Sequence, residues 1–233
     1  DITKIPLTNT GRVRRFVKEK CFRKVINPKT HKKHIPYKSL MDRLTLDVLE
    51  YAYAKQAFLG GYTHANARYS KKLLKDVHSI DFTSSYPTVM LSEKYPMSKG
   101  TLIKLDMNSY DEFNTYLKQS DRVAVVMVEL WDIETKSDIP DDYISCSRLY
   151  KKGEQIMNNN GRVHKADYVQ LIVTSVDLAQ IVSCYNYTKI HIIDGYFYYV
   201  DYLPKEIIES ILELYEKKTT LKGVKGKETE YLL

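Results

Sequence analysis

The chain has 233 residues and a formal net charge of +7, with 43% apolar residues, 20 tyrosines and three cysteines. This apolar content can fill the core of one good-sized domain or two small ones without disulfides. No apolar run approaches the roughly 20 residues of a bilayer-spanning helix, and no signal-peptide pattern is visible. Cys21, Cys146 and Cys184 form no CxxC pair, which argues against a disulfide framework or structural zinc and favours a reducing cytoplasm.

Charge is distributed unevenly along the chain. Residues 1–78 contain 18 Lys and Arg against 6 Asp and Glu, whereas the remainder contains 18 against 23. Clustered positive charge together with many tyrosines suits a polyanion partner, because basic side chains neutralise phosphates and aromatic rings stack on bases. The alternative is a basic surface that only keeps the protein in solution.

Helical and strand patterns are mixed along the chain. Helices are predicted over 12–23, from 39 to the Gly60-Gly61 pair, and over 86–92, 110–118, 175–184 and from 205 onward. Strands are predicted over 77–82, 123–131, 155–157, 162–164, 168–173, 189–193 and 196–200, with a hairpin turn at Asn160-Gly161. This order predicts an α+β fold.

One octapeptide carries the main chemical signal: Ile80-Asp81-Phe82-Thr83-Ser84-Ser85-Tyr86-Pro87. We expect Asp81 at the end of a buried strand, before a tight turn into a helix whose entry is set by Pro87. A carboxylate held there can ligate Mg²⁺, and the backbone N–H groups at the helix entry can hold a triphosphate. The alternative is a carboxylate that only caps the helix.

The octapeptide resembles motif A of B-family DNA polymerases, Asp-x-x-Ser-Leu-Tyr-Pro, with Ser85 replacing the usual leucine. The resemblance implies that Asp81 bridges two catalytic Mg²⁺ ions and that the Phe82 backbone carbonyl completes one coordination sphere. It also implies that Ser84 and Ser85 offer backbone N–H groups to the phosphates of a dNTP. Tyr86 would exclude a ribose 2′-OH by steric clash.

A second segment, Phe58-Leu59-Gly60-Gly61-Tyr62, resembles the Tyr-x-Gly-Gly motif between the exonuclease and polymerase domains of this family, with Phe58 in the tyrosine position. The resemblance implies that Phe58, Gly60, Gly61 and Tyr62 contact the DNA template, since paired glycines allow close backbone approach. A plain helix stop is the alternative.

A third segment, 214–220, resembles the helix that precedes motif B in phage polymerases, including protein-primed ones. It implies that Lys218 faces the phosphates of the incoming nucleotide, and the alternative is a solvated helix face. The stretches 148–153 and 175–178 are similar to the insertion that protein-primed members use near their primer protein.

Two acidic segments imitate family motifs. Asp132-Ile133-Glu134 matches the Asp-x-Glu element of proofreading exonucleases, but it follows motif A rather than preceding it. Tyr199-Val200-Asp201 imitates the start of motif C but lacks its second aspartate. We interpret both as surface features.

The sequence contains neither motif B nor motif C, which we expect to follow Leu233. Because two-metal catalysis needs carboxylates from motifs A and C, we expect weak or absent Mg²⁺ binding and no activity in this chain alone. The first residue, Asp1, and the helical pattern around Leu233 further indicate an internal piece of a longer protein.

The sequence thus predicts part of a DNA-directed DNA polymerase: a basic segment and palm part with motif A (1–100), an inserted α/β subdomain similar to the terminal-protein region (101–204), and the first helix of the fingers (205–233). Expected partners are a DNA primer–template, a dNTP and, as a further candidate, a terminal (primer) protein, in the host cytoplasm and without a membrane. The alternative is a non-catalytic module that binds nucleic acid or a primer protein.

Overall fold

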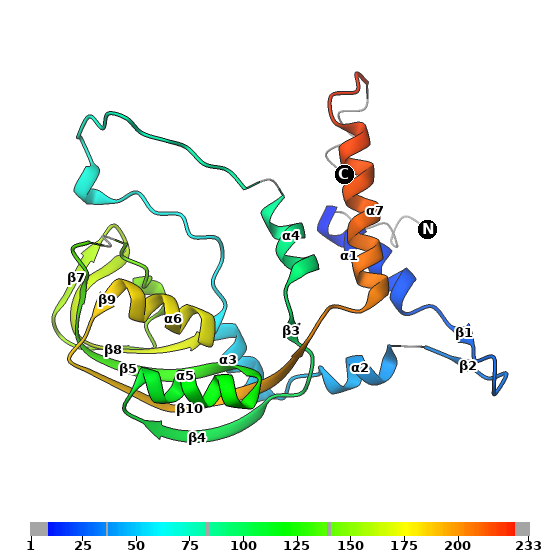
Figure 1. Ribbon diagram of the computed structural model, residues 1–233, viewed down its shortest axis with the longest axis horizontal. Coiled ribbons are helices and arrows are strands. Elements are labelled where there is room, and N and C mark those ends of the chain that lie inside the picture. Colours follow the sequence, from blue (N-terminus) through cyan, green and yellow to red (C-terminus); the bar gives the residue numbers. More distant parts are fainter. Residues whose placement is uncertain (1–8, 36, 83, 139–140, 227–233) are drawn as a thin grey trace. The chain divides into compact units, whose positions relative to one another are not determined.

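The computed structural model describes residues 9–35, 37–82, 84–138 and 141–226. The chain folds into two compact units and passes between them repeatedly. Unit 1 comprises residues 1–45, 80–97 and 201–233, and unit 2 comprises residues 46–79 and 98–200. Helices and strands occur together (Figure 1), which confirms the predicted α+β fold class.

The limits of the two units lie close to two of the predicted region boundaries, but one segment falls in the other unit. The predicted boundaries after residues 100 and 204 lie near the limits of unit 2 at 98 and 200, whereas residues 46–79 lie in unit 2 rather than with motif A. Assignment of these parts to palm, insertion and fingers stays a prediction. Residues 227–233, the end of the third predicted region, lie outside the described residues.

Long antiparallel strands form the centre of unit 2. Strand β5 (Arg122–Thr135) pairs on one side with β10 (Lys189–Asp201) and on the other with β8 (Arg162–Thr174). Shorter strands extend this sheet: β4 (Thr101–Met107) beside β10, β6 (Lys151–Lys152) and β7 (Ile156–Asn159) beside β8, and β9 (Tyr185–Asn186) at the end of β5.

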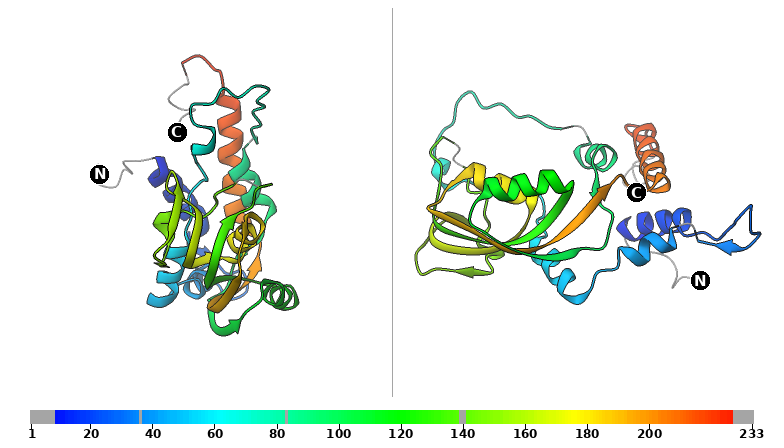
Figure 2. Two further views of the ribbon diagram at one scale, coloured as in Figure 1. Left: turned by 90° about the vertical axis from the view of Figure 1, so that its left-hand side faces the viewer. Right: turned by 60° about the horizontal axis from the view of Figure 1, so that its bottom comes forward.

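One face of the sheet is covered by α5 (Tyr110–Ser120) and α6 (Ser175–Cys184), as Figures 1 and 2 show. Side chains from both helices and from the sheet form a fully buried core there, including Phe113, Val126, Val128, Leu130 and Leu178. Each helix starts at a side-chain cap: the Ser109 hydroxyl accepts from the Glu112 backbone N–H, and the Thr174 hydroxyl accepts from that of Asp177.

Helix α3 (Val48–Ala57) packs on the other face. Tyr53 of this helix packs edge-on against Tyr196, with ring centroids 5.3 Å apart, and its hydroxyl donates to Asp194 at 2.7 Å. The fully buried Glu50 on α3 accepts a hydrogen bond from the Gly100 backbone N–H at 2.9 Å. These contacts fix α3 on the sheet.

Beyond α3, the same face carries a polar cluster. Glu129 accepts hydrogen bonds from Tyr168 at 2.6 Å and from Gln170 at 3.1 Å, and it lies 3.1 Å from Nδ1 of His191. The Nε2 atom of His191 lies 2.8 Å from Asp106. Burial opposes ionisation of Glu129, but the hydrogen bonds from Tyr168 and His191 outweigh it and lower the pKa of this carboxyl. Hydrogen bonds to Glu129 and Asp106 raise the pKa of His191.

Unit 1 is built mainly from helices that are distant in sequence: α1 (Asn9–Cys21), α2 (Lys38–Arg43), α4 (Ser85–Ser92) and α7 (Lys205–Leu221). It also contains the short strands β1 (Val25–Ile26), β2 (Lys33–His34) and β3 (Tyr95–Pro96). Lys20 of α1 pairs with Glu213 of α7, and α4 also packs on α7. Within the described ranges, no helix is both long and apolar enough to cross a membrane.

Most predicted elements are confirmed, with bounds shifted by a few residues. The Asn160-Gly161 turn joins β7 to β8 with φ values of +49° and +84°, as a tight hairpin requires. The predicted strands over 189–193 and 196–200 form the single strand β10 with a bulge between Ile192 and Asp194. Gly195 is needed there for close packing rather than for a turn, because a Cβ atom would lie 2.6 Å from Val126.

Two predictions are wrong in ways that matter for the site. The helix predicted from residue 39 onward is two helices, because Asp47 accepts from the Glu50 backbone N–H at 2.8 Å and starts α3 as a new helix. The buried strand predicted over 77–82 does not form, and Val77 and Ile80 are 71% and 83% exposed. A strand needs a neighbour for its backbone groups, and no described strand pairs with this segment.

Replacement of Gly100 should destabilise unit 2. An added methyl group would lie 2.5 Å from the Glu50 carboxylate and 2.8 Å from the Tyr198 ring. We expect Gly100→Ala to lower the free energy of unfolding by about 2 kcal/mol in urea denaturation. Gly60→Ala is the matched control, since no atom of a described residue outside positions 59–61 lies within 4 Å of its Cβ position. Equal effects of the two substitutions would contradict the packing of Gly100.

The polar cluster predicts a coupled titration of His191. Its raised pKa means that its contribution to stability is complete below the ordinary histidine pKa and is lost as the pH rises through the raised value. We expect Glu129→Gln to lower the pKa of His191 in an NMR titration of the histidine ring protons. The control Glu134→Gln removes a carboxylate that pairs with Lys165 instead and should leave His191 unchanged. An unchanged His191 in Glu129→Gln would refute the coupling.

Candidate nucleotide site

The turn into α4 has an unusual backbone. Ser84 adopts the left-handed conformation, with φ +53° and ψ +41°, and its side chain does not cap the helix. The first hydrogen bond of α4 runs from the Thr88 N–H to the Ser84 carbonyl at 3.0 Å, so the N–H groups of Ser84, Ser85 and Tyr86 have no partner within the helix, and Pro87 contributes no N–H group. This turn therefore directs backbone donors and the positive end of the helix dipole at the same place, which suits an anion.

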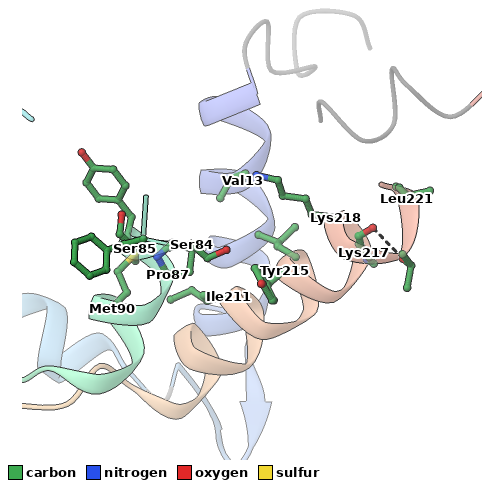
Figure 3. A pocket seen from close by; sticks show the side chains of 14 residues that line it. Val13, Ser84, Ser85, Pro87, Met90, Ile211, Tyr215, Lys217, Lys218 and Leu221 are labelled. Carbon is green, nitrogen blue, oxygen red and sulfur yellow. Dashed lines mark hydrogen bonds between the residues drawn. The ribbon is translucent and has the colours of Figure 1, made fainter. Parts of the chain in front are cut away.

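A cavity of about 1130 Å³ lies in front of this turn, between α4 and α7 (Figure 3). Residues of the predicted nucleotide site line it from both helices: Phe82, Ser84, Ser85, Tyr86 and Lys218. Lys217 of α7 also lines the cavity, although no motif indicated a role for this residue. The structure thus brings the end of the octapeptide and the lysine pair of α7 to one cavity.

The rest of the cavity wall is apolar. It comes from α1, α4 and α7 and includes Val13, Met90, Ile211, Leu214 and Tyr215. Tyr86 is 74% exposed at this cavity, so its ring is available to a ligand. An apolar wall combined with backbone donors and lysine is the usual composition of a pocket that holds an organic anion.

Asp81 lies just before the cavity-lining residues and does not line the cavity itself. Asp81 is exposed, and Phe82 is 78% exposed, because the strand predicted over 77–82, to which both belong, does not form. In the described part of the chain, no three His, Cys, Asp or Glu side chains gather as metal ligands. Since Mg²⁺ takes six oxygen ligands, Asp81 and the Phe82 carbonyl cannot form a complete site by themselves.

The predicted template contacts lie in unit 2. Phe58 follows α3 and is 68% exposed, and Gly60 and Gly61 are exposed as well. The Tyr62 ring, in contrast, contacts the side chains of Tyr143 and Arg162. Its ring stacks on Tyr143 at a centroid distance of 6.0 Å and an interplanar angle of 9°, and the Arg162 guanidinium carbon lies 4.5 Å from the ring centroid.

The Tyr62 hydroxyl donates to Asp141 at 3.1 Å. Burial and this hydrogen bond together raise the pKa of Tyr62 to about 12. The hydroxyl therefore stays protonated through the physiological range and keeps its bond to Asp141. Nothing in the residues 58–62 themselves indicated this contact.

The carboxylates of the two acidic imitations of family motifs are exposed in the structure. Asp132 accepts from the Thr188 hydroxyl at 2.7 Å, and Glu134 pairs with Lys165 at 2.8 Å. Asp201 accepts from the Tyr202 backbone N–H at 2.8 Å. Each carboxylate thus has a local structural partner.

Comparison with known proteins identifies the family. The chain matches the family described as DNA polymerase type B, organellar and viral, over residues 19–232. It is 26% identical to a DNA polymerase of Bacillus phage B103 and 24% identical to one of Bacillus phage Nf, in each case over 76% of this chain and 27% of the phage protein.

The fold is also similar to that of solved structures. Phi29 DNA polymerase complexed with primer-template DNA and incoming nucleotide substrates aligns with a TM-score of 0.61 at 19% identity, over 92% of this chain and 33% of that chain. Phi29 DNA polymerase with primer-template DNA in a binary complex aligns with a TM-score of 0.56 at 19% identity, over 80% of this chain and 30% of that one.

The chain spans about a quarter to a third of the length of these relatives. The family match nevertheless covers nearly all of its own residues, including the octapeptide 80–87 and the helix α7. The chain therefore belongs to the organellar and viral family of type B DNA polymerases.

Proposed function

We propose that this chain is the part of a template-directed DNA polymerase that receives the incoming dNTP, in the cavity between α4 and α7. One observation carries the proposal: residues from two motifs far apart in sequence, Ser84 to Tyr86 and Lys218, line the same cavity. Membership of the polymerase family supports it.

Each cavity residue has a role in this proposal. The backbone N–H groups of Ser84 and Ser85 bind the β- and γ-phosphates, because the start of α4 directs donors and positive potential at the cavity. Lys218 adds a positive charge on a flexible stem on the phosphate side. Tyr86 packs under the sugar and rejects a ribose 2′-OH by steric clash.

Asp81 would hold Mg²⁺ together with the Phe82 carbonyl, and the remaining ligands would come from outside the described residues. When bound, the metal ions activate the primer 3′-OH and stabilise the charge that develops on the phosphates. In the reaction, the 3′-oxygen forms a bond to the α-phosphorus while the bond to the pyrophosphate oxygen breaks. The residues of this chain orient the triphosphate for that displacement.

The remaining proposed contacts concern DNA. Phe58, Gly60, Gly61 and Tyr62 contact the template strand near its backbone, where a pair of glycines leaves room for close approach. A DNA primer–template is the proposed partner, and a terminal (primer) protein is a further candidate because of the similarity of 148–153 and 175–178 to protein-primed enzymes. The host cytoplasm is the proposed compartment.

The test of the active site is primer extension by the intact polymerase with Asp81→Asn. We expect extension to fall about a thousandfold or more while DNA affinity changes less than about twofold, because a metal ligand is lost and no DNA contact is. Asp76→Asn makes the same charge change at an exposed position and is the control. Full activity of Asp81→Asn would refute the proposal. DNA binding that depends on salt, without extension by any variant, would favour a non-catalytic binding module.

The role of Lys218 predicts a change in nucleotide affinity. We expect Lys218→Ala to raise the KM for dNTP about tenfold, since a charge-assisted phosphate contact is lost. Lys222→Ala, at the exposed end of α7, is the matched control and should leave this KM unchanged. Steady-state kinetics at constant ionic strength distinguish the two variants. Equal changes in both would mean that Lys218 acts only through the general positive potential.

A further inference from the structure

A buried carboxylate in unit 2 lies outside the nucleotide cavity and serves no role in the proposed reaction. The side chain of Asp142 is fully buried, and it accepts hydrogen bonds from the side chains of Thr135 and Asn159. Its Oδ1 atom lies 3.0 Å from Nδ1 of His164. Burial would raise the pKa of Asp142, but the hydrogen bonds from Thr135, Asn159 and His164 outweigh it, and the pKa is lowered.

Asn159 connects this carboxylate to residues 62–68, which we call the docked segment. Its amide nitrogen donates both to Asp142 and, at 3.1 Å, to the side-chain oxygen of Asn66. Its side-chain oxygen accepts from the Ala67 backbone N–H at 2.8 Å, and its backbone carbonyl accepts from His64 at 2.8 Å. One 7% exposed side chain therefore orients the docked segment on the β7–β8 hairpin.

Further bonds hold the docked segment on the same hairpin. The Asn66 side-chain oxygen also accepts from the Arg68 backbone N–H at 3.0 Å, which starts the 3₁₀ turn η2 (Ala67–Tyr69). The Nδ1–H group of His164 donates to Asp142, and its Nε2 atom lies 3.3 Å from the Arg68 guanidinium and can accept from it, so this histidine joins Arg68 and Asp142. Asn160 donates to the Ala65 carbonyl at 3.1 Å.

The docked segment begins where the proposed DNA contacts end. From Phe58 to Asn66 the backbone forms neither helix nor strand, so helical or sheet hydrogen bonds do not fix it. Gly60 and Gly61 lack side chains that could anchor them, and the next residue, Tyr62, is stacked on Tyr143. The glycine pair therefore lies between two anchored parts of the chain, α3 and the docked segment.

We propose that Asn66, Asn159 and Asp142 are positioning residues that fix the Gly60-Gly61 backbone for DNA binding by clamping the docked segment on the β7–β8 hairpin. This inference rests on the proposed function of residues 58–62. The clamp lowers the entropy cost of ordering the glycine pair when DNA binds, because the segment is already held in one conformation. It contributes to DNA affinity without touching DNA.

Asn66→Ala in the intact polymerase tests the clamp. The substitution removes the acceptor for Asn159 and Arg68, leaves the bonds within the hairpin, and changes no charge. We expect primer–template affinity to fall about five- to tenfold, by the same factor at each salt concentration, since no phosphate contact is lost. Hydrogen exchange of the Ala67 amide, which donates to the Asn159 side chain within the clamp, should become faster.

Two comparison variants make the result specific. Asn158→Ala, at an exposed position of the same hairpin, should change neither affinity nor exchange. Asn66→Asp keeps an oxygen acceptor at the same place and should restore slow exchange of the Ala67 amide. Thermal unfolding of each variant separates loss of the clamp from loss of the fold.

Faster exchange with unchanged DNA affinity would overturn the inference, and so would unchanged exchange. If Asn66→Ala fails to fold, Asn66→Ser, which retains a shorter acceptor, provides the same two readouts. Failure of the proposed function is distinguishable, because it would appear as extension that does not depend on Asp81. Extension that depends on Asp81, with wild-type DNA affinity in Asn66→Ala, would reject the clamp alone.

Discussion

Burial of strand β5 on both faces is the constraint on which the rest of unit 2 depends. Its residues alternate between the core beneath α5 and α6 and the smaller cluster beneath α3, with Val126 and Val128 on one side and Val125 and Met127 on the other. A register slip of one residue would exchange these two sets. Pairing with β10 on one side and with β8 on the other also provides hydrogen-bond partners for the backbone of β5. The helices α5 and α6 on one face and α3 on the other are therefore positioned by this strand.

The elements that could be predicted from sequence are those with local causes. The valine-rich stretch at 123–131 and the Asn160-Gly161 turn specify β5 and the β7–β8 hairpin through neighbouring residues alone. Segment 77–82 also contains residues that favour strands, Val77, Ile80 and Phe82, yet it remains exposed because strand formation needs a partner at long range. The composition of a segment indicates its tendency to form a strand, but it does not indicate whether a partner strand is present.

In the candidate site, too, the individual residues were indicated by local motifs, whereas their arrangement depends on contacts between distant parts of the chain. A short motif identified Asp81, Ser84, Ser85 and Tyr86, and a second motif identified Lys218, but their common cavity depends on the packing of α4 against α7. The cluster around Asp142 had no sequence signal. An aspartate that directly follows another aspartate, two residues after a proline, is typical of a surface loop. Here, however, the partners of Asp142 come from positions 135, 159 and 164.

The alternation of the chain between the two units has a consequence for the order of folding. The chain crosses between units after residues 45, 79, 97 and 200. During synthesis from the N-terminus, unit 2 has all its residues once position 200 has emerged, while unit 1 still lacks α7, against which α1 and α4 pack. The first two parts of unit 1 must therefore wait, with their apolar helix faces uncovered, until a later unit has closed. Within the described residues, α7 is thus made after unit 2 and completes unit 1, and α1 and α4, uncovered until then, offer apolar surface to chaperones during synthesis.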